Sequence, residues 1–348
     1  MVTISLCMIV KNEEAVLSRC LDSIADFMDE IIILDTGSTD RTKEIAARYT
    51  DKVYDYAWTG DFSAARNASF EKATMEYIYC ADADEVLEGE NQEKFRQLKE
   101  VLLPEIEMVQ MYYETITEGE QLYNFKREYR PKLFKRIRTF TWIDAIHETV
   151  RLEPVVYDSD IVIAHRPQGN HGARDIAALY QLTEKESFLS PKLHHMYAME
   201  LLHMGSEEEL QQAVGYFSGV QQEETGDLSF EKKEEMARES ACVLAKAFRL
   251  QGNLHGFFTQ CMKETAGGNP CSEICFQLGE YYFGAEEYQE AVMWFYNAAY
   301  ETESILDVHA GGDKALERLA ECYGLMGNIE EEKRVRQEVK IWEMPQDM

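Results

Sequence analysis

The chain has 348 residues, of which 45% are apolar, and 64 Asp and Glu against 35 Lys and Arg give it a formal net charge of -29 at pH 7. Its length and apolar content predict two or three packed domains, and its acidity argues against non-specific binding to nucleic acid or anionic lipid. The eight cysteines have neither zinc-site nor disulfide-framework spacing, and no stretch reads as a secretory leader or a membrane span. We therefore expect a cytoplasmic protein with buried, reduced thiols.

Strand and helix patterns alternate at the start of the chain. Apolar runs of strand type are followed by stretches with apolar residues at helical spacing. This rhythm predicts a parallel sheet with right-handed crossovers, in which ligands bind at the carboxyl ends of the strands. The expected strands are residues 3–10, 30–34 and 52–56, and the expected helices are residues 15–27 and 41–49.

Polar residues follow these strands at the points where ligands would bind. Asn12 and Glu13 follow the first strand and Asp35 follows the second, while a later apolar run from residue 77 leads into Asp82 and Asp84. On an extended backbone residues i and i+2 point to the same side, so the last two carboxylates would face one spot. A divalent cation with phosphate ligands would balance their charge. The alternative is that they only end a strand and start a turn.

Basic residues mark two further places in this part of the chain. Arg66 lies near the start of a helix expected from residue 60 to about 74, where the helix dipole disfavours a cation, so a nearby anion would explain it. The alternative is a plain surface arginine. A cluster between residues 126 and 138 would attract a diphosphate, although its members could also pair with surface carboxylates. The cluster consists of Lys126, Arg127, Arg130, Lys132, Lys135, Arg136 and Arg138.

Titratable residues follow the basic cluster. Asp144, His147 and Glu148 lie within five residues of one another, and His165 closes a strand expected over residues 160–164. A neutral imidazole at a strand end is a candidate metal ligand, although a lone histidine is often a hydrogen-bonded structural residue.

Helical patterns replace strand patterns from about residue 176. One pair of helices matches the small and aromatic positions of the tetratricopeptide pattern, and a weaker pair precedes it. Residues 199–217 and 316–332 resemble more degenerate pairs, so a short helical-repeat domain is expected. The matching positions are Leu278, Gly279, Tyr282, Ala291, Phe295 and Ala298 in the first pair, and Ala245, Phe248, Phe257 and Cys261 in the second.

Four ordered blocks resemble the family 2 glycosyltransferases of the GT-A fold. They are residues 4–14 (ISLCMIVKNEE), 34–40 (LDTGSTD), 61–67 (DFSAARN) and 82–85 (DADE). Residues 130–135, 147–148 and 163–165 resemble later segments of the family. The branch with a tetratricopeptide tail, which includes sublancin-type peptide S-glycosyltransferases, is the most similar. The resemblance implies an α/β GT-A domain, which binds a nucleotide diphospho-sugar, over residues 1–174, and an all-α helical-repeat domain over residues 175–348.

The resemblance also implies roles for single residues. Asp35 would accept the uracil N3–H of a UDP-sugar, Asp82 would reach the ribose or sugar, and Asp84 would bind Mn²⁺ or Mg²⁺ with His165 as a further ligand. The backbone at residues 9–12 would cradle the base and ribose. The residues expected to bind the donor are Ile9, Val10, Asn12, Glu13, Asp35, Arg66, Asp82, Ala83 and Lys132.

The expected reaction is transfer of a hexose to a peptide or protein acceptor, with inversion at the anomeric carbon. A carboxylate or histidine would take the acceptor proton, and we favour Glu148 over His147 and Asp144 because it stays ionised and matches the family's acidic block. The tail would be an acceptor platform or a homodimer surface. The rival interpretations are a repeat-containing adaptor with a degenerate sugar-nucleotide module, which the intact carboxylates disfavour, and a nucleotidyltransferase, which would open with a glycine-rich loop.

Overall fold

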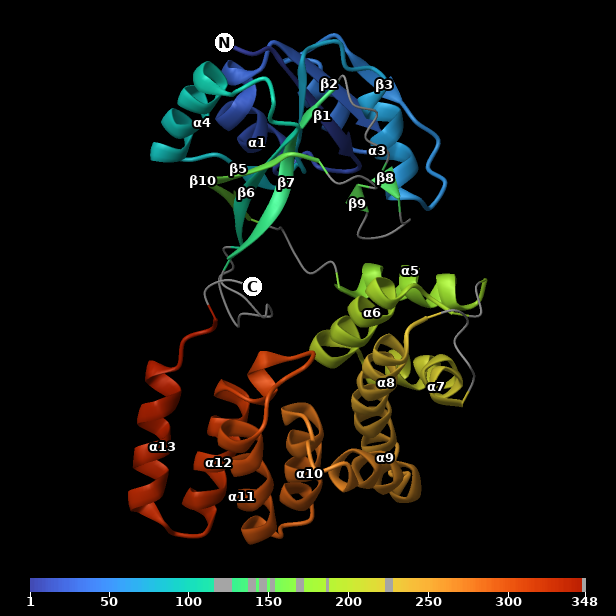
Figure 1. The fold of residues 1–348 in the computed structure, drawn as a ribbon, viewed down its shortest axis with the longest axis vertical. Helices are drawn as coiled ribbons and strands as arrows, with labels where there is room; N and C mark the ends of the chain where they lie inside the picture. Colours follow the sequence, from blue (N-terminus) through green and yellow to red (C-terminus); the bar gives the residue numbers. More distant parts are fainter. Residues whose placement is uncertain are drawn as a thin grey trace. The chain divides into compact units, whose positions relative to one another are not determined.

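The computed structural model describes residues 1–115, 127–136, 142–143, 149–150, 154–166, 172–185, 188–222 and 228–345. The chain divides into two compact units, Met1–Asn170 and His171–Pro345. Figure 1 shows the elements of both units. No helix within the described ranges is long and apolar enough to cross a membrane.

The first unit is built on one mixed sheet of eight strands in the order β3-β2-β1-β4-β7-β6-β10-β5. Strands β1 to β4 are mutually parallel, as expected, whereas β7 lies antiparallel between β4 and β6. The strands are β1 (Ile4–Val10), β2 (Glu30–Asp35), β3 (Val53–Asp55), β4 (Tyr77–Cys80), β5 (Glu85–Val86), β6 (Met108–Thr115), β7 (Arg127–Lys135) and β10 (Val156–His165); β8 (Trp142–Ile143) and β9 (Thr149–Val150) form a separate pair.

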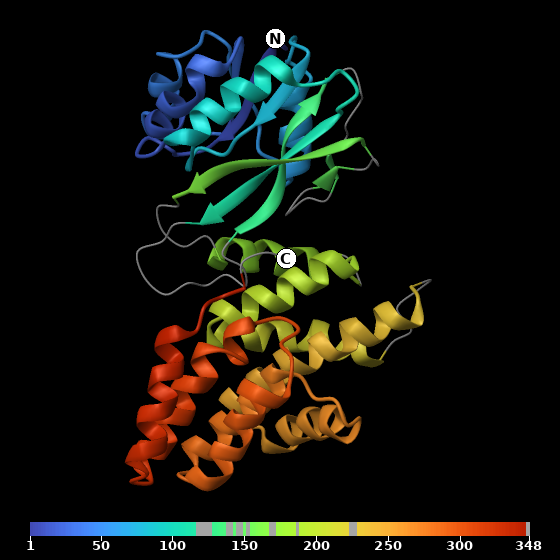
Figure 2. The ribbon, with the colours of Figure 1, turned by 60° about the vertical axis from the view of Figure 1, so that its left-hand side comes forward.

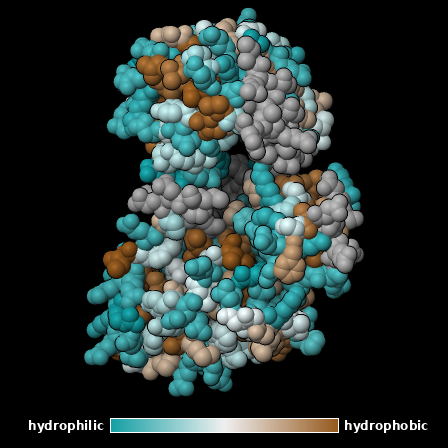
Figure 3. Space-filling model, in the orientation of Figure 1, coloured by the Kyte–Doolittle hydropathy of each residue, from teal (hydrophilic) through white to brown (hydrophobic). Residues whose placement is uncertain are grey.

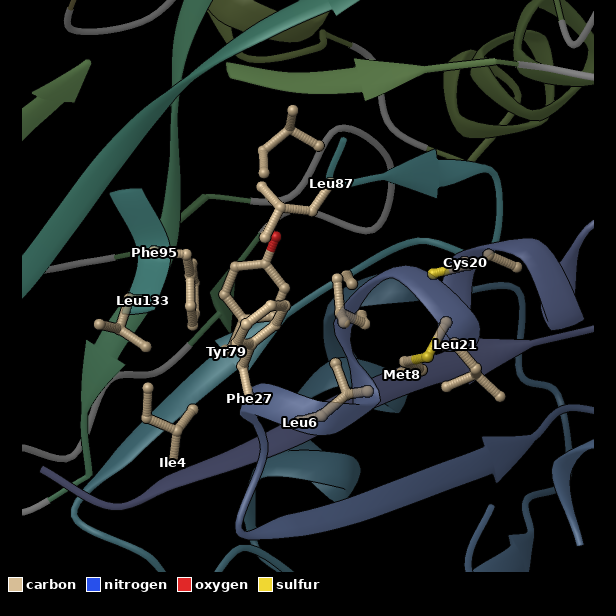
Figure 4. Close-up of a cluster of buried hydrophobic side chains, with 14 of the residues drawn as sticks. Ile4, Leu6, Met8, Cys20, Leu21, Phe27, Tyr79, Leu87, Phe95 and Leu133 are labelled. Atoms are coloured by element: carbon tan, nitrogen blue, oxygen red, sulfur yellow. The ribbon is translucent and has the colours of Figure 1, made fainter. Parts of the chain in front are cut away.

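Helices cover both faces of this sheet (Figures 1 and 2). Helices α1 (Leu17–Ile24), α2 (Thr42–Ala46) and α4 (Glu90–Val101) contribute to the larger apolar core, which Figure 4 shows around Tyr79. Helix α3 (Phe62–Phe70) packs on the opposite face through its last residue. Covered faces leave the strand ends as the accessible part of the sheet.

The second unit consists of helices, as the sequence pattern predicts (Figure 2). Successive helices contact one another, for example α10 with α11 and α12 with α13. The helices are α5 (Gly172–Thr183), α6 (Pro191–Met204), α7 (Glu207–Gln222), α8 (Phe230–Leu250), α9 (Leu254–Ala266), α10 (Ser272–Gly284), α11 (Tyr288–Tyr296), α12 (Asp313–Leu325) and α13 (Ile329–Ile341), with short helical segments at Asn297–Glu301 and Val308–Ala310. A further short segment, Ala25–Phe27, lies in the first unit.

Helix packing in this unit depends on small residues opposite aromatic ones. A Cβ atom at Gly279 would lie 2.5 Å from the ring of Phe295, so only glycine lets α10 and α11 approach this closely. Ala291, Phe295 and Ala298 are fully buried. The outer surface differs, because hydrophilic residues predominate on the face of each unit visible in Figure 3, as the net charge requires.

Candidate functional site

Asp35 ends β2 with one carboxylate oxygen bonded and the other unused. Oδ1 accepts backbone hydrogen bonds from Gly37 at 3.0 Å and Ser38 at 2.9 Å, and Gly37 has a φ of 106°, which favours glycine. Oδ2 is buried, since Asp35 is only 1% exposed, and it has no hydrogen-bond partner among the described residues. A buried acceptor without a donor is costly, so this oxygen is suited to a ligand N–H group.

Asn12 fastens the end of β1 to the turn after Asp35. Its backbone N–H donates to Ser38 Oγ at 2.9 Å, and its side-chain oxygen accepts from the backbone of Thr39 at 2.8 Å. Asn12 has a φ of 57°, in the left-handed region that asparagine tolerates. The next residue, Glu13, donates its backbone N–H to Thr42 Oγ1 at 2.7 Å. The two loops therefore hold each other in place before any ligand binds.

The remaining residues expected at this edge lie in β1 itself. Ile9 and Val10 pair in parallel register with Leu34 and Asp35. The Val10 carbonyl oxygen accepts from the backbone of Thr36 at 2.9 Å. The end of β1, the end of β2 and the following turn thus form one continuous hydrogen-bonded edge.

The two aspartates of the 82–84 segment have different partners, and they do not lie on the extended backbone that was expected. Strand β4 ends at Cys80, and the chain then turns, with the Glu85 N–H donating to the Asp82 carbonyl at 3.2 Å. Because the backbone is not extended here, the i, i+2 rule does not apply. Asp82 Oδ1 lies 3.3 Å from Arg66 Nη2, whereas Asp84 Oδ2 lies 3.0 Å from His165 Nε2. Ala83, between them, is buried.

Asp82 is surrounded by cations. Arg66 is 8% exposed, donates from Nη1 to the sulfur of Cys80 and contacts Asp82, so a protein anion accounts for its position in α3. Burial raises the pKa of Asp82, but the charges of Arg66, Lys132 and Arg130 outweigh it and hold that pKa well below its usual value. The Asp82 side chain is still 42% exposed, so the carboxylate on which these cations act is open to solvent.

Two of these cations, Arg130 and Lys132, lie in strand β7, whose pairing with β6 is irregular at this point. Val109 of β6 pairs with Leu133 and Gln110 pairs with Pro131, which leaves Lys132 as an extra residue in a bulge. The guanidinium of Arg130 lies 3.7 Å from the centre of the Tyr113 ring. Burial opposes the charge of Arg130, but the neighbouring Tyr113 and carboxylates raise its pKa.

Lys132 forms a buried ion pair with Glu85, and both side chains are less than a tenth exposed. Glu85 Oε2 has no partner in the part of the chain that the structure describes. Burial raises the pKa of Glu85; Lys132 opposes this, while Asp82 and Asp84 add to it. The Lys132 charge is therefore shared between Glu85 and the solvent-accessible Asp82.

The rest of the basic cluster serves other contacts. Lys135 donates to the carbonyl of Pro104 and Arg136 to that of Met75, while Arg127 lies over the Tyr112 ring at 4.2 Å. Lys126 and Arg138 lie outside the described residues. The cluster of seven is thus not one surface, and Arg130 and Lys132 are the described members that act on Asp82.

Asp84 and His165 form the pair that could hold a divalent cation. Their side chains are 16% and 13% exposed, and His165 closes β10 as expected. The other ring nitrogen of His165 lies 3.2 Å from Thr115 Oγ1, which orients the imidazole as a hydrogen-bond partner behind a metal ligand would. A carboxylate oxygen and an imidazole nitrogen fit Mn²⁺ well, and Mg²⁺ through the carboxylate.

Three contributing residues were not expected from the sequence. Glu85 forms an ion pair with Lys132, the ring of Tyr113 contacts the guanidinium of Arg130, and Thr115 orients His165. Only the sequence position of Glu85, directly after Asp84, could have drawn attention to it. The expected bases Asp144, His147 and Glu148 lie outside the described residues.

Comparison with known proteins gives the family of this segment. Residues 5–150 match the family model described as glycosyl transferase family 2. The chain is 51% identical over 87 residues to a TPR repeat-containing protein of Synechococcus elongatus, covering 25% of this chain and 22% of the relative. It is 42% identical over 102 residues to the SPbeta prophage-derived glycosyltransferase SunS of Bacillus subtilis, covering 29% of this chain and 24% of the relative.

Each alignment thus spans less than a quarter of the relative's own length. A solved structure of glucosyl-3-phosphoglycerate synthase from Mycobacterium tuberculosis, in complex with Mn²⁺, UDP-glucose and phosphoglyceric acid, aligns with a TM-score of 0.39 and 16% identity over 54% of this chain and 81% of that chain. A TM-score this low is no basis for inferring a donor or a metal. The two observations agree: residues 5–150 match the glycosyl transferase family 2 model, and they form a mixed sheet with helices on both faces, the α/β architecture expected of a GT-A domain.

Proposed function

We propose that this protein transfers a hexose from a UDP-sugar to a peptide or protein acceptor. The observation that carries the proposal is the buried, unpartnered Oδ2 of Asp35 at the carboxyl edge of the sheet. The family match supports sugar transfer, and the resemblance to SunS, which is named a glycosyltransferase, agrees with it.

The donor would lie along the carboxyl edge of the sheet. Asp35 Oδ2 would accept the uracil N3–H, and the edge held by Asn12 would receive the base and ribose. Arg66, Arg130 and Lys132 surround Asp82 with positive charge, which would attract the diphosphate and stabilise charge on it as the sugar leaves.

A divalent metal would be held by Asp84 and His165. When bound, Mn²⁺ or Mg²⁺ supplies electrostatic stabilisation of the departing diphosphate. Arg66 contacts the Asp82 carboxylate, which is 42% exposed and would contact the ribose or sugar. Thr115 keeps one His165 nitrogen occupied and leaves Nε2 directed at Asp84.

The proton of the acceptor requires a base on the side opposite the diphosphate. We keep Glu148 in this role, with His147 and Asp144 as alternatives, and we propose inversion at the anomeric carbon. A thiol acceptor, with a pKa of about 8.5, would need the base least. The helical unit is proposed as the platform for a peptide or protein acceptor, or as the surface of a homodimer.

Donor hydrolysis provides the first test. The full chain would be incubated with a panel of UDP-hexoses, with Mn²⁺ or with a chelator, and released UDP would be measured. We expect one donor to be turned over in a metal-dependent manner. Binding of UDP without turnover of any donor would favour the adaptor, and consumption of a nucleoside triphosphate with a sugar phosphate would favour the nucleotidyltransferase.

The acceptor would be sought separately. Lysate proteins treated with the enzyme and the accepted donor would be examined by mass spectrometry for an added hexose. Modification confined to lipid or free sugar would refute the peptide or protein acceptor while leaving glycosyl transfer intact.

A further inference from the structure

Three potential metal ligands meet in the interior of the helical unit. Cys242 lies in α8, Cys271 is the residue before the first turn of α10, and Glu273 lies within that turn. The two sulfur atoms are 3.3 Å apart, and one ligand atom of each of the three residues lies within 4.8 Å of the others. Each residue is at most 2% exposed. The spacing of the cysteines along the sequence gives no sign of this convergence.

Glu273 is held in a fixed position but uses only half of its carboxylate. Oε1 accepts backbone hydrogen bonds from Ile305, Leu306 and Asp307 at 2.9, 2.7 and 2.7 Å. Oε2 is buried and accepts no hydrogen bond from a nitrogen or oxygen donor within residues 228–345, all of which the structure describes, while the Cys271 thiol lies within reach of the carboxylate. A fixed, buried carboxylate with so few donors beside two sulfur atoms is suited to a cation.

Neither a simple thiol pair nor a disulfide accounts for this arrangement. One thiol can donate to the other across 3.3 Å, but that contact does not involve the Glu273 carboxylate that lies beside both sulfur atoms. A disulfide would also leave Glu273 Oε2 without a partner. A metal ion would deprotonate the thiols and satisfy the carboxylate oxygen at the same time.

The local charges fit a divalent ion. Two thiolates and one carboxylate around a doubly charged cation leave one negative charge. Arg238, one turn before Cys242 in α8, lies close enough for its guanidinium to interact electrostatically with both sulfur atoms. Thiolate with carboxylate is a donor set that suits Zn²⁺ and does not suit Mg²⁺ or Ca²⁺.

We propose that Cys242, Cys271 and Glu273 bind one Zn²⁺ ion, with the fourth tetrahedral position left to water. The ion would join α8 to the start of α10 and so fasten one helix pair to the next. Its role would be structural, since metal bound only by the folded state stabilises that state. This site is separate from the proposed donor site, and its ligands are of a different chemical class.

The test uses the full chain and two probes. Zn²⁺ content after purification would be measured by elemental analysis, and the reduced protein would then be unfolded with a chelator and refolded with Co²⁺. We expect one Zn²⁺ per chain and, with Co²⁺, a thiolate charge-transfer band. A metal bound at Asp84 and His165 has no sulfur ligand, so it cannot produce that band.

Variants identify the ligands. Cys242→Ser, which leaves only the Cys271 thiolate, should lower the intensity of the band. Glu273→Gln, which keeps both thiols, should weaken Co²⁺ binding by more than the roughly 10- to 100-fold typical of losing a partner that only orients a ligand. Cys322→Ser removes another fully buried thiol, in α12, and should leave the band unchanged. Should Cys242→Ser fail to fold, Glu273→Gln still tests the assignment.

Three results would overturn the proposal. They are a refolded protein without the charge-transfer band, a band of undiminished intensity in folded Cys242→Ser, and unchanged affinity in Glu273→Gln. A purified chain whose mass reveals a disulfide between Cys242 and Cys271 would also overturn it.

Discussion

Replacing Asp35 with asparagine separates its two carboxylate oxygens. The amide oxygen of the substituted side chain can keep the hydrogen bonds that Gly37 and Ser38 now donate to Oδ1. The amide nitrogen then replaces the unpartnered Oδ2 and offers a donor where the proposed uracil N3–H also needs an acceptor. The substitution therefore leaves the turn intact and removes only the group proposed to recognise the base.

The size of the effect follows from the single bond that is lost. A hydrogen bond to a charged group contributes about 1.5–3 kcal/mol, and each 1.4 kcal/mol is roughly a factor of ten in Kd. The Asp35→Asn variant should thus bind UDP about 10- to 150-fold more weakly. The free energy of unfolding without ligand should not fall, because a buried unpaired charge is removed. Asp35→Ala should instead lose stability as well, since both turn hydrogen bonds disappear.

Titration calorimetry with UDP and with CDP, in the presence of a chelator, would measure this. The N3 atom of cytosine is an acceptor, so the asparagine variant should discriminate less against CDP than the native chain does. Unchanged UDP affinity in a folded Asp35→Asn variant would refute the assignment of Oδ2 to the base. An equal loss for UDP and CDP would show that the variant disturbs the edge and not the recognition of uracil.

Four further outcomes are expected. Asp84→Asn should weaken UDP binding in Mn²⁺ but not in a chelator, as measured by calorimetry; equal loss in both would exclude a metal role. Glu148→Gln should lower transfer to a hydroxyl acceptor by about 100-fold or more with donor binding retained, and full transfer would move the base to His147. Gly279→Ala should cost about 1–3 kcal/mol by overpacking, seen as a lower melting temperature, whereas Gly284→Ala, which has open space, should not. Burial lowers the pKa of His194 from 6.5 to about 4. The free energy of unfolding should therefore keep its full value above pH 6.5 and fall by up to roughly 3 kcal/mol as the pH drops to 4. The same dependence of this free energy on pH in a His194→Gln variant would contradict the prediction.

Helices and strands whose apolar residues recur at a regular spacing could be predicted from the sequence. The parallel strands at the start of the chain and the helices after residue 172 follow directly from their apolar spacing. Asp35 was placed correctly at a strand end because the apolar run before it is unbroken. Gly279 was placed correctly opposite an aromatic residue because the repeat pattern fixes both positions.

Features that depend on contacts between distant residues could not be predicted. The chain turns after Cys80, so Asp82 and Asp84 have different partners, and no local signal distinguishes that turn from a continued strand. The antiparallel placement of β7 depends on pairing with both β4 and β6. For the same reason the sequence did not reveal that Glu85 would partner Lys132 or that Cys242 would lie beside Cys271.

The bulge in β7 divides that strand into two parts with different tolerance to change. Leu133 and Phe134, after the bulge, are fully buried in the two cores on either side of the sheet. Arg130, before it, lies beside Tyr113 on the face that also holds Leu133, although regular alternation would put residues three apart on opposite faces. The residues before the bulge still pair with β6, but none of them belongs to either core. A substitution there should therefore disturb the packing of the sheet less than one at Leu133 or Phe134.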